Sequence, residues 1–144
     1  MKMAAHSLGL QFLVENASSE LEIEAAIAAF AQARVNVMFI AGDPFFTSRR
    51  GQLAALSARH TMPTCHPARP NVEAGGLMSY GANTTDVYRQ IGIYTGRILK
   101  GEKPADLPVQ QSAKFELVIN LTTAKALGIV VPNKLLSLAD VVIE

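Results

Sequence analysis

Small and polar residues stand at the ends of two apolar runs, residues 35–41 and 77–81. In open α/β sheets, ligands bind beyond the carboxyl ends of the strands, so these residues could line one rim of a binding site. The candidate ligand-binding residues are Gly42, Asp43, Glu73, Ser79, Tyr80 and Gly81. A plainer interpretation remains open, in which Asp43 begins a helix, Glu73 is a solvated charge and the glycines shape turns.

Residue types and spacing give little support to catalysis or metal binding. Cys65 and His66 are neighbours in an expected strand, where adjacent side chains point to opposite faces and cannot act as a nucleophile and its base. His6, His60 and His66 lack the spacing of metal ligands on a helix. Neither glycine-rich phosphate motif is present, and the G-x-S-x-G nucleophile elbow is absent. We expect no catalytic residue, metal or cofactor, and therefore no enzyme.

Composition favours a folded protein without a nucleic-acid or membrane surface. The 144 residues are 49% apolar and 17% charged, with a net charge of +1. The chain has enough apolar residues for a core and no block of like charge to follow phosphates. No apolar run approaches a membrane span, and the N-terminus lacks the features of a secretory signal. From these features alone, the chain would remain cytoplasmic.

Local patterns predict alternating helices and strands. Residues 1–8 fit the last turns of a helix with Gly9 behind it, and 10–15 are strand-like. Ser19 and Glu22 have capping-box spacing before a helix that reaches about residue 34. The apolar run near 35–41 predicts a buried strand, 47–60 a helix, and 62–66 and 77–81 two further strands separated by a loop. Asn83 could cap a helix that closes at Gly101.

The remaining third of the chain differs in composition. Residues 102–114 contain two prolines and little that is apolar, so we expect an extended crossover. Beyond it, 114–120 is strand-like, Asn120 could cap a helix that ends at Gly128, and Pro132 opens a short final helix. The alternation predicts an α/β fold, with a mostly parallel sheet flanked by helices.

Several segments resemble the carboxyl half of the tryptophan/tyrosine-type family of ABC-transporter substrate-binding proteins. They are IAGDPFF (40–46), LSARHTMP (56–63), VEAGGLMSYG (72–81) and RILKGEKPADLPVQQSAKFELVINLTTAKALGIVVP (97–132). The resemblance implies a partial type I periplasmic binding fold that captures a small solute, such as an aromatic amino acid, for a membrane permease. It also implies a periplasmic or extracytoplasmic location for the full-length proteins. Asp43 would suit the ammonium group of the solute.

Two departures from the family pattern affect these expectations. HPARPN (66–71) replaces the aromatic or basic stretch more often found before VEAGG, which leaves the solute undetermined. Family chains are about twice as long, so residues 1–104 would form a partial second lobe and 105–144 a crossover and tail that returns to the first lobe. Apolar tail residues would then lack a cover, which predicts a homo-oligomer. They are Phe115, Leu117, Ile119, Leu135, Leu136, Val141 and Val142.

The leading hypothesis is therefore a truncated solute-binding component of an ABC importer. Two alternatives stay open from the sequence. One is a cytosolic small-molecule-sensing effector domain, although no DNA-binding segment is evident. The other is a flavodoxin-like enzyme domain, which would want an acidic cluster that Glu15 alone does not provide.

Overall fold

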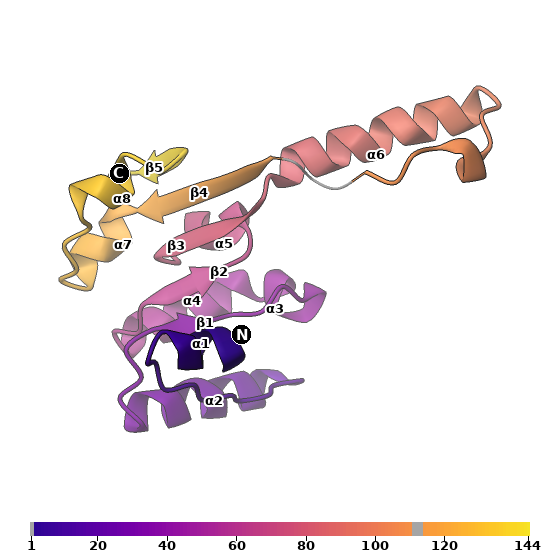
Figure 1. Cartoon of the computed structure of the whole chain (residues 1–144). Coiled ribbons are helices and arrows are strands. Elements are labelled where there is room, and N and C mark those ends of the chain that lie inside the picture. Colours follow the sequence, from indigo (N-terminus) through magenta and orange to yellow (C-terminus); the bar gives the residue numbers. More distant parts are fainter. Residues whose placement is uncertain (1, 111–113) are drawn as a thin grey trace.

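A five-stranded sheet forms the centre of the protein in the computed structural model, which describes residues 2–110 and 114–144 (Figure 1). The strands lie in chain order: β1 (Met38–Phe39), β2 (Thr64–His66), β3 (Met78–Ala82), β4 (Phe115–Asn120) and β5 (Val141–Ile143). β1, β2 and β3 are parallel, β4 runs antiparallel to β3, and β5 is parallel to β4. The expected α/β class with a mostly parallel sheet is confirmed.

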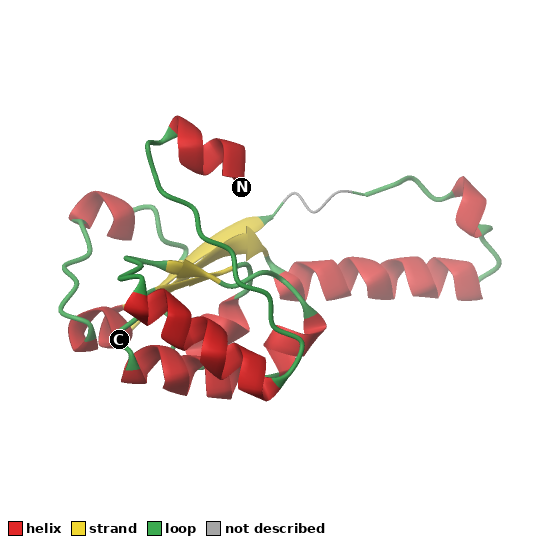
Figure 2. Cartoon of the chain, turned by 90° about the horizontal axis from the view of Figure 1, so that it is seen from below, coloured by secondary structure: helices red, strands yellow, loops and turns green. Residues whose placement is uncertain are grey.

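The principal core lies between one face of this sheet and the helices α2 (Glu20–Gln32) and α4 (Arg50–Arg59). Its buried members are Ile23, Ile27, Met38, Ile40, Leu53, Leu56 and Met62. Helix α5 (Arg69–Glu73) contacts β2, β3 and β4. Figure 2 shows that α1 (Lys2–Ser7) lies on the other side of the sheet from α2. Most of the packing against helices is therefore on one face.

The opposite face, which we call the open face, carries exposed apolar side chains. Phe39, Cys65, Met78, Ile119 and Val142 are successive register partners across the five strands. Ile119 in this row is buried, but Phe39 and Val142 at its edges are exposed. Tyr80 and Phe115, which the alternation places on the same face, are exposed as well.

The expected capping residues begin their helices as the sequence predicts. The Ser19 hydroxyl accepts a hydrogen bond from the Glu22 N–H of α2 at 3.3 Å. Asn83 Oδ1 accepts from the Asp86 N–H of α6 (Thr84–Leu99) at 2.9 Å. Asn120 caps α7 (Leu121–Ala126) in the same way, and α8 (Asn133–Leu136) begins directly after Pro132. Side-chain oxygens satisfy backbone donors that a helix start leaves unpaired.

The strand expected over 10–15 is wrong. Residues 10–17 adopt no regular secondary structure, and the apolar side chains Leu10, Leu13 and Val14 are exposed. β1 pairs only with β2 among the described residues, so no strand lies on its outer side. The apolar character of this segment was a sound strand signal, but a strand also needs a paired neighbour.

Three other segments differ from the expectations. Instead of one helix over 47–60, α3 (Pro44–Ser48) begins at the proline and a break at Arg49 separates it from α4. α5 occupies part of an expected loop, with Pro70 in its first turn, where a missing N–H costs nothing. β5 was not predicted, because VVI is too short a run to separate from the end of a helix.

Residues 84–110, which we call the arm, project from the rest of the protein (Figure 1). The arm comprises α6, the 3₁₀ turn η1 (Pro104–Asp106) and the extended residues up to 110. No residue of α6 is buried. The crossover expected over 102–114 is extended up to residue 110 except for the 3₁₀ turn η1, while 111–113 lie outside the described residues.

Residues 115–144 return to the sheet as β4 and β5. Leu117 and Ile119 are buried there, so the expectation that these two would lack a cover is wrong. Phe115 and Val142 are exposed, in agreement with it. The division of the chain at residue 104 into a lobe and a returning tail stays a prediction.

Candidate functional site

The carboxyl edge of the parallel strands brings the loops after β1 and β2 against β3. A Cβ at Gly42 would lie 3.2 Å from Pro67 Cγ, and a Cβ at Gly81 would overlap the Pro67 carbonyl oxygen. Pro67 therefore sits between two glycines that lack a side chain where the backbone approaches closely. The structure brings together two of the expected site residues, Gly42 and Gly81, around a residue that the sequence analysis did not single out.

Asp43 lies beside this contact and caps helix α3. Its Oδ1 accepts a hydrogen bond from the Phe45 N–H at 2.7 Å, and the side chain is exposed. Within the described residues, Oδ2 makes no hydrogen bond and no ion pair. The carboxylate thus has a local structural role and still offers one oxygen and its charge to a ligand at the carboxyl edge.

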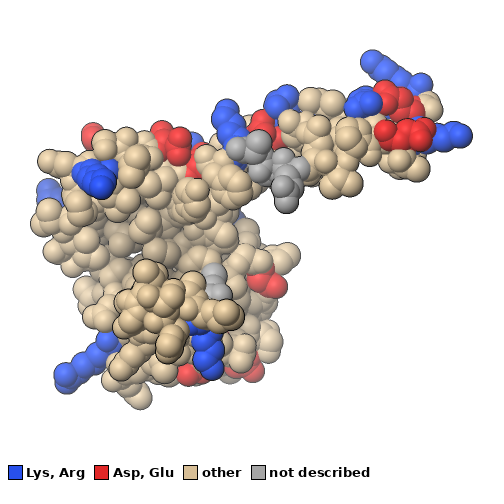
Figure 3. All heavy atoms as spheres, viewed as in Figure 1, with Lys and Arg blue, Asp and Glu red and all other residues tan. Residues whose placement is uncertain are grey.

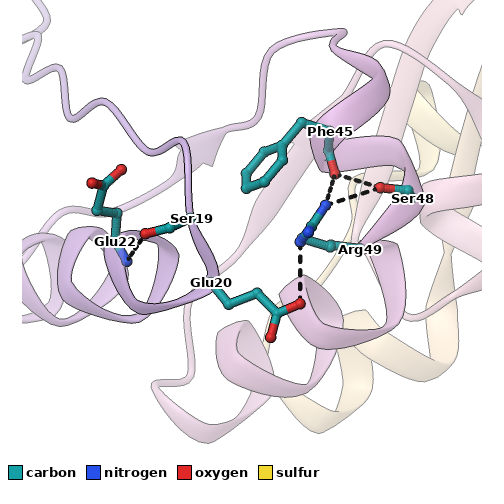
Figure 4. Close-up of polar contacts among 6 residues, drawn as sticks. All are labelled: Ser19, Glu20, Glu22, Phe45, Ser48 and Arg49. Atoms are coloured by element: carbon teal, nitrogen blue, oxygen red, sulfur yellow. Dashed lines mark hydrogen bonds and ion pairs between the residues drawn. The ribbon is translucent and has the colours of Figure 1, made fainter.

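A guanidinium group stands at the break between α3 and α4 (Figure 4). Arg49 lies over the Phe45 ring at 4.1 Å, and its Nε is 3.4 Å from Glu20 Oε1 in the first turn of α2. Its Nη1 donates to the Ser48 hydroxyl at 3.2 Å and to the Phe45 carbonyl at 3.4 Å. These contacts hold the start of α2 against the segment that carries Asp43.

Asn83 joins the carboxyl end of β3 to the start of β4. Its side-chain Nδ2 donates to Glu116 Oε2 at 2.9 Å, and its backbone N–H donates to the Lys114 carbonyl at 2.8 Å. Glu116 is buried. The arm therefore leaves and returns to the sheet through a hydrogen-bonded pair of strands beside the candidate rim.

Ser79 lies away from that rim. It is only 1% exposed and pairs in register with His66, on the face covered by α5. The Ser79 hydroxyl and His66 Nδ1 have no hydrogen-bond partner among the described residues. His66 Nε2 shares a hydrogen bond of 3.0 Å with the Thr64 hydroxyl, and burial lowers the pKa of His66 to about 4. Ser79 is thus an interior residue in this structure.

Tyr80 and Glu73 lie in two further places. The Tyr80 ring is on the open face, 66% exposed, and stacks on Phe115 with ring centroids 5.9 Å apart. Glu73 ends α5 and forms an ion pair of 2.7 Å with Arg69. The structure thus groups Gly42, Asp43 and Gly81, and separates Glu73, Ser79 and Tyr80 from them.

The described residues contain no group of three His, Cys, Asp or Glu side chains placed to hold a metal. Cys65 is half-buried on the open face, burial raises the pKa of its thiol, and His66 points to the other face. The two side chains therefore point apart, as the strand pattern predicts. Among the described residues, no helix has the length and apolar character needed to cross a membrane.

Pro67 and Arg49 were not among the residues that the sequence predicted at this edge. Pro67 follows the expected strand at 62–66, so its position at a strand end was a usable signal. Arg49 was placed inside a continuous helix, because the start of α3 at Pro44 was not recognised. A helix that begins at Pro44 would have shown that residues 44–49 follow directly on the carboxyl end of β1.

The family model described as "ABC transporter substrate binding protein" matches residues 1–143. No curated protein matches the sequence. Among solved structures, a conserved domain protein from Vibrio cholerae is 27% identical, with a TM-score of 0.87 over 98% of this chain and 47% of its own. An ABC domain from Streptococcus pneumoniae in complex with L-Trp is 29% identical, with a TM-score of 0.88 over 99% of this chain and 48% of its own.

A third solved structure is similar at the level of the fold. It is the ligand-free, open form of a substrate-binding protein with adhesive properties from Clostridium difficile, 22% identical, with a TM-score of 0.68 over 99% of this chain and 47% of its own. The chain spans about half the length of each of these three proteins.

Proposed function

We propose that this chain, which belongs to the ABC transporter substrate-binding protein family, forms one wall of a solute-binding site that serves an ABC importer. The observation that carries the proposal is the family match over residues 1–143. The rim at Gly42, Asp43 and Gly81 supports it, because it lies at the carboxyl edge where sheets of this class bind ligands.

The proposed solute is an amino acid. Asp43 keeps Oδ2 and its negative charge available, and a charge-assisted hydrogen bond to an ammonium group would use both. The Streptococcus pneumoniae relative, whose structure contains L-Trp, supports an aromatic amino acid as the first ligand to test. The proposed activity is capture and release without a chemical step.

Two further parts of the proposal concern binding partners: a permease for the longer proteins and a second copy for this chain. A permease would receive the solute, and the binding component would act outside the cytoplasm, as the family membership suggests. We also propose that this chain forms a homo-oligomer, since it exposes apolar side chains such as Phe115 and Val142. Neither part depends on which solute is bound.

The test is a titration of the chain with L-tryptophan, monitored by the backbone amide NMR signals of residues 42–45. One wall supplies only part of the contacts of a closed cleft, so we expect weak binding, about millimolar. Asp43→Asn keeps the cap, because asparagine caps as well as aspartate does, but removes the charge. We expect it to abolish the signal changes while the free energy of unfolding stays within about 0.5 kcal/mol of the parent value.

Two ligands act as controls for the group that Asp43 contacts. Indole-3-propionate lacks the ammonium group and should bind neither protein, whereas tryptamine retains that group and should bind the parent chain but not the Asp43→Asn variant. Signal changes that are the same in the parent and in Asp43→Asn would show that Asp43 has no part in binding. If no amino acid shifts any amide at the carboxyl edge, the proposed solute class is wrong.

A further inference from the structure

Asn120 links three segments of the protein at the end of β4. It is 5% exposed, and its side-chain Oδ1 accepts a hydrogen bond from the Thr123 N–H at 2.9 Å, which caps α7. Its Nδ2 donates to the Val72 carbonyl at 3.1 Å, and its backbone N–H donates to the Leu77 carbonyl at 2.9 Å. The capping role uses only the oxygen, so the bond from Nδ2 to α5 is a second role.

A second bond runs from α7 to the loop after α5. The Thr123 hydroxyl donates to the Gly75 carbonyl at 3.1 Å. Both bonds join residues that are 48 positions apart in the chain. Val72 lies in the last turn of α5 and is fully buried. We call Asn120 and Thr123, with the two carbonyls that their side chains bind, the latch. The latch ties the carboxyl end of α5 to the junction of β4 and α7.

Helix α5 is too short to keep its position by itself. It has five residues, and its N-cap residue, Ala68, makes no side-chain hydrogen bond to the helix. Isolated helices shorter than about 12 residues are marginal in water. The place of α5 therefore depends on its packing against β2, β3, β4 and α4 and on the latch. Because hydrogen bonds are directional, the latch fixes where the helix lies along the sheet.

The residues that lead into α5 contact the rim. Pro67 comes two residues before the helix and lies between Gly42 and Gly81. Both contacts are tight, because a Cβ at Gly81 would overlap the Pro67 carbonyl oxygen and a Cβ at Gly42 would lie 3.2 Å from Pro67 Cγ. Closely packed groups transmit a displacement to their neighbours. A shift of α5 along the sheet would therefore move Pro67 against Gly42 and Gly81.

Neutral groups make the polar links between residues 115–144 and α5. Figure 3 shows charged side chains on the arm and around the outer parts of the molecule, while the middle of this view is largely free of them. Within the described residues, no ion pair joins residues 115–144 to α5, and Arg69 and Glu73 of this helix pair with each other. The latch therefore supplies the directional contacts between these two parts of the chain.

We propose that Asn120 and Thr123 are positioning residues for the solute-binding rim, which they hold in place through α5. This inference rests on the proposed function, because the rim is where that function places the solute. The role is indirect, since Asn120 lies beside Leu77, and Gly81 is four residues further along the chain, about 13 Å away at about 3.3 Å per residue. A change of either latch side chain reaches the rim only through the structure between them.

The backbone amide NMR signals of Gly42 and Gly81, recorded without solute, test the positioning role. Asn120→Ser keeps a capping oxygen and removes the donor to α5, and Thr123→Val removes the hydroxyl at a similar side-chain volume. We expect each variant to shift both glycine signals. Thr123→Ser keeps the hydroxyl and should retain the signals of the parent. Circular dichroism shows which variants are folded, and Thr123→Val decides the question if Asn120→Ser does not fold.

Ala124→Gly is the matched control for this test. Ala124 is 2% exposed in the same helix, so glycine there destabilises α7 and leaves both latch side chains in place. If α7 had only a structural role, this variant would move the rim signals as well, whereas we expect them to stay at the parent positions. Rim signals that stay in place in a folded latch variant, or that move equally in Ala124→Gly, overturn the proposal.

Titration with L-tryptophan shows whether the positioned rim serves the solute. We expect Asn120→Ser and Thr123→Val to raise the dissociation constant at least about threefold, and Ala124→Gly less than about twofold. A constant that equals that of the parent in both latch variants overturns the role of the latch in solute binding. If the parent binds no amino acid, the proposed function fails, and the glycine signals still decide whether the latch positions the rim.

Discussion

Cys65 and His66 show how the face of a strand decides what a side chain experiences. They are adjacent in β2, yet Cys65 pairs in register with Met78 on the open face and His66 pairs with Ser79 on the covered face. Gly76 also contributes to the environment of His66, because a Cβ there would lie 2.6 Å from His66 Nε2. His66 is therefore enclosed and neutral, and it makes the core sensitive to acid.

Acidification should destabilise the protein through His66. Its pKa is about 4 in the folded chain and 6.5 when unperturbed, so the unfolded state takes up a proton first as the pH falls. The stabilisation is complete above pH 6.5 and is lost between pH 6.5 and 4, at about 1.4 kcal/mol for each unit. Urea denaturation at several pH values measures it.

His6 provides the matched control for this prediction, because its side chain is exposed. His66→Gln should flatten the dependence of unfolding free energy on pH between 6.5 and 4, whereas His6→Gln should leave it unchanged. If the slope is the same in His66→Gln as in the parent, the acid sensitivity comes from other groups.

Helix ends in this protein repeatedly use one backbone motif. The residue after the helix cap adopts a positive φ, and its N–H donates a hydrogen bond to the carbonyl three residues earlier. The N–H of the next residue donates to the carbonyl five residues before it. Gly9, Gly101 and Gly128 occupy the positive-φ position after α1, α6 and α7. Arg34 and Thr61 occupy it after α2 and α4, with φ of 53° and 50°. A search of the sequence for glycine would therefore find the ends of α1, α6 and α7 but miss those of α2 and α4.

Thr61 is the most strained of these positions, because a β-branched residue is costly at positive φ. Thr61→Gly should raise the free energy of unfolding by about 1 kcal/mol. Gly128→Ala should lower it by a similar amount, since a Cβ at Gly128 contacts nothing and only the backbone conformation is penalised. Chemical denaturation followed by circular dichroism checks both; a loss of stability in Thr61→Gly would contradict the assigned strain.

Across the protein as a whole, the arm and the open face place apolar side chains on two separate surfaces. Val109 is 99% exposed, and Phe39 and Phe115 are each about half exposed. If self-association buried these side chains, the free energy of unfolding would depend on the concentration of the protein.

The melting temperature should therefore rise with protein concentration. If self-association buries these apolar side chains, mass action stabilises the folded protein as the concentration increases. Calorimetry of the parent over about a hundredfold range of concentration should show the rise, and Phe115→Glu, which places a charge among the exposed apolar side chains, should reduce it. A constant melting temperature in the parent would indicate that folding and association are independent.

Elements whose signals are local could be predicted from the amino-acid sequence. Ser19, Asn83 and Asn120 begin helices because a side-chain oxygen reaches a backbone N–H within three residues. Apolar runs placed β2, β3 and β4, and the specific block at 97–132 was enough to indicate the family. Such signals depend only on residues a few positions apart in the chain, and these can be read from the sequence without knowledge of the fold.

Which residues meet was decided by tertiary packing. Residues 10–15 have a strand-like composition but no pairing partner among the described residues, and Ser79 belongs to a predicted rim yet lies in the core. The contact of Gly42 and Gly81 with Pro67 joins two loops and strand β3, which are separate in sequence. Strand pairing and burial depend on surfaces brought together from far along the chain, and local propensity carries no information about them.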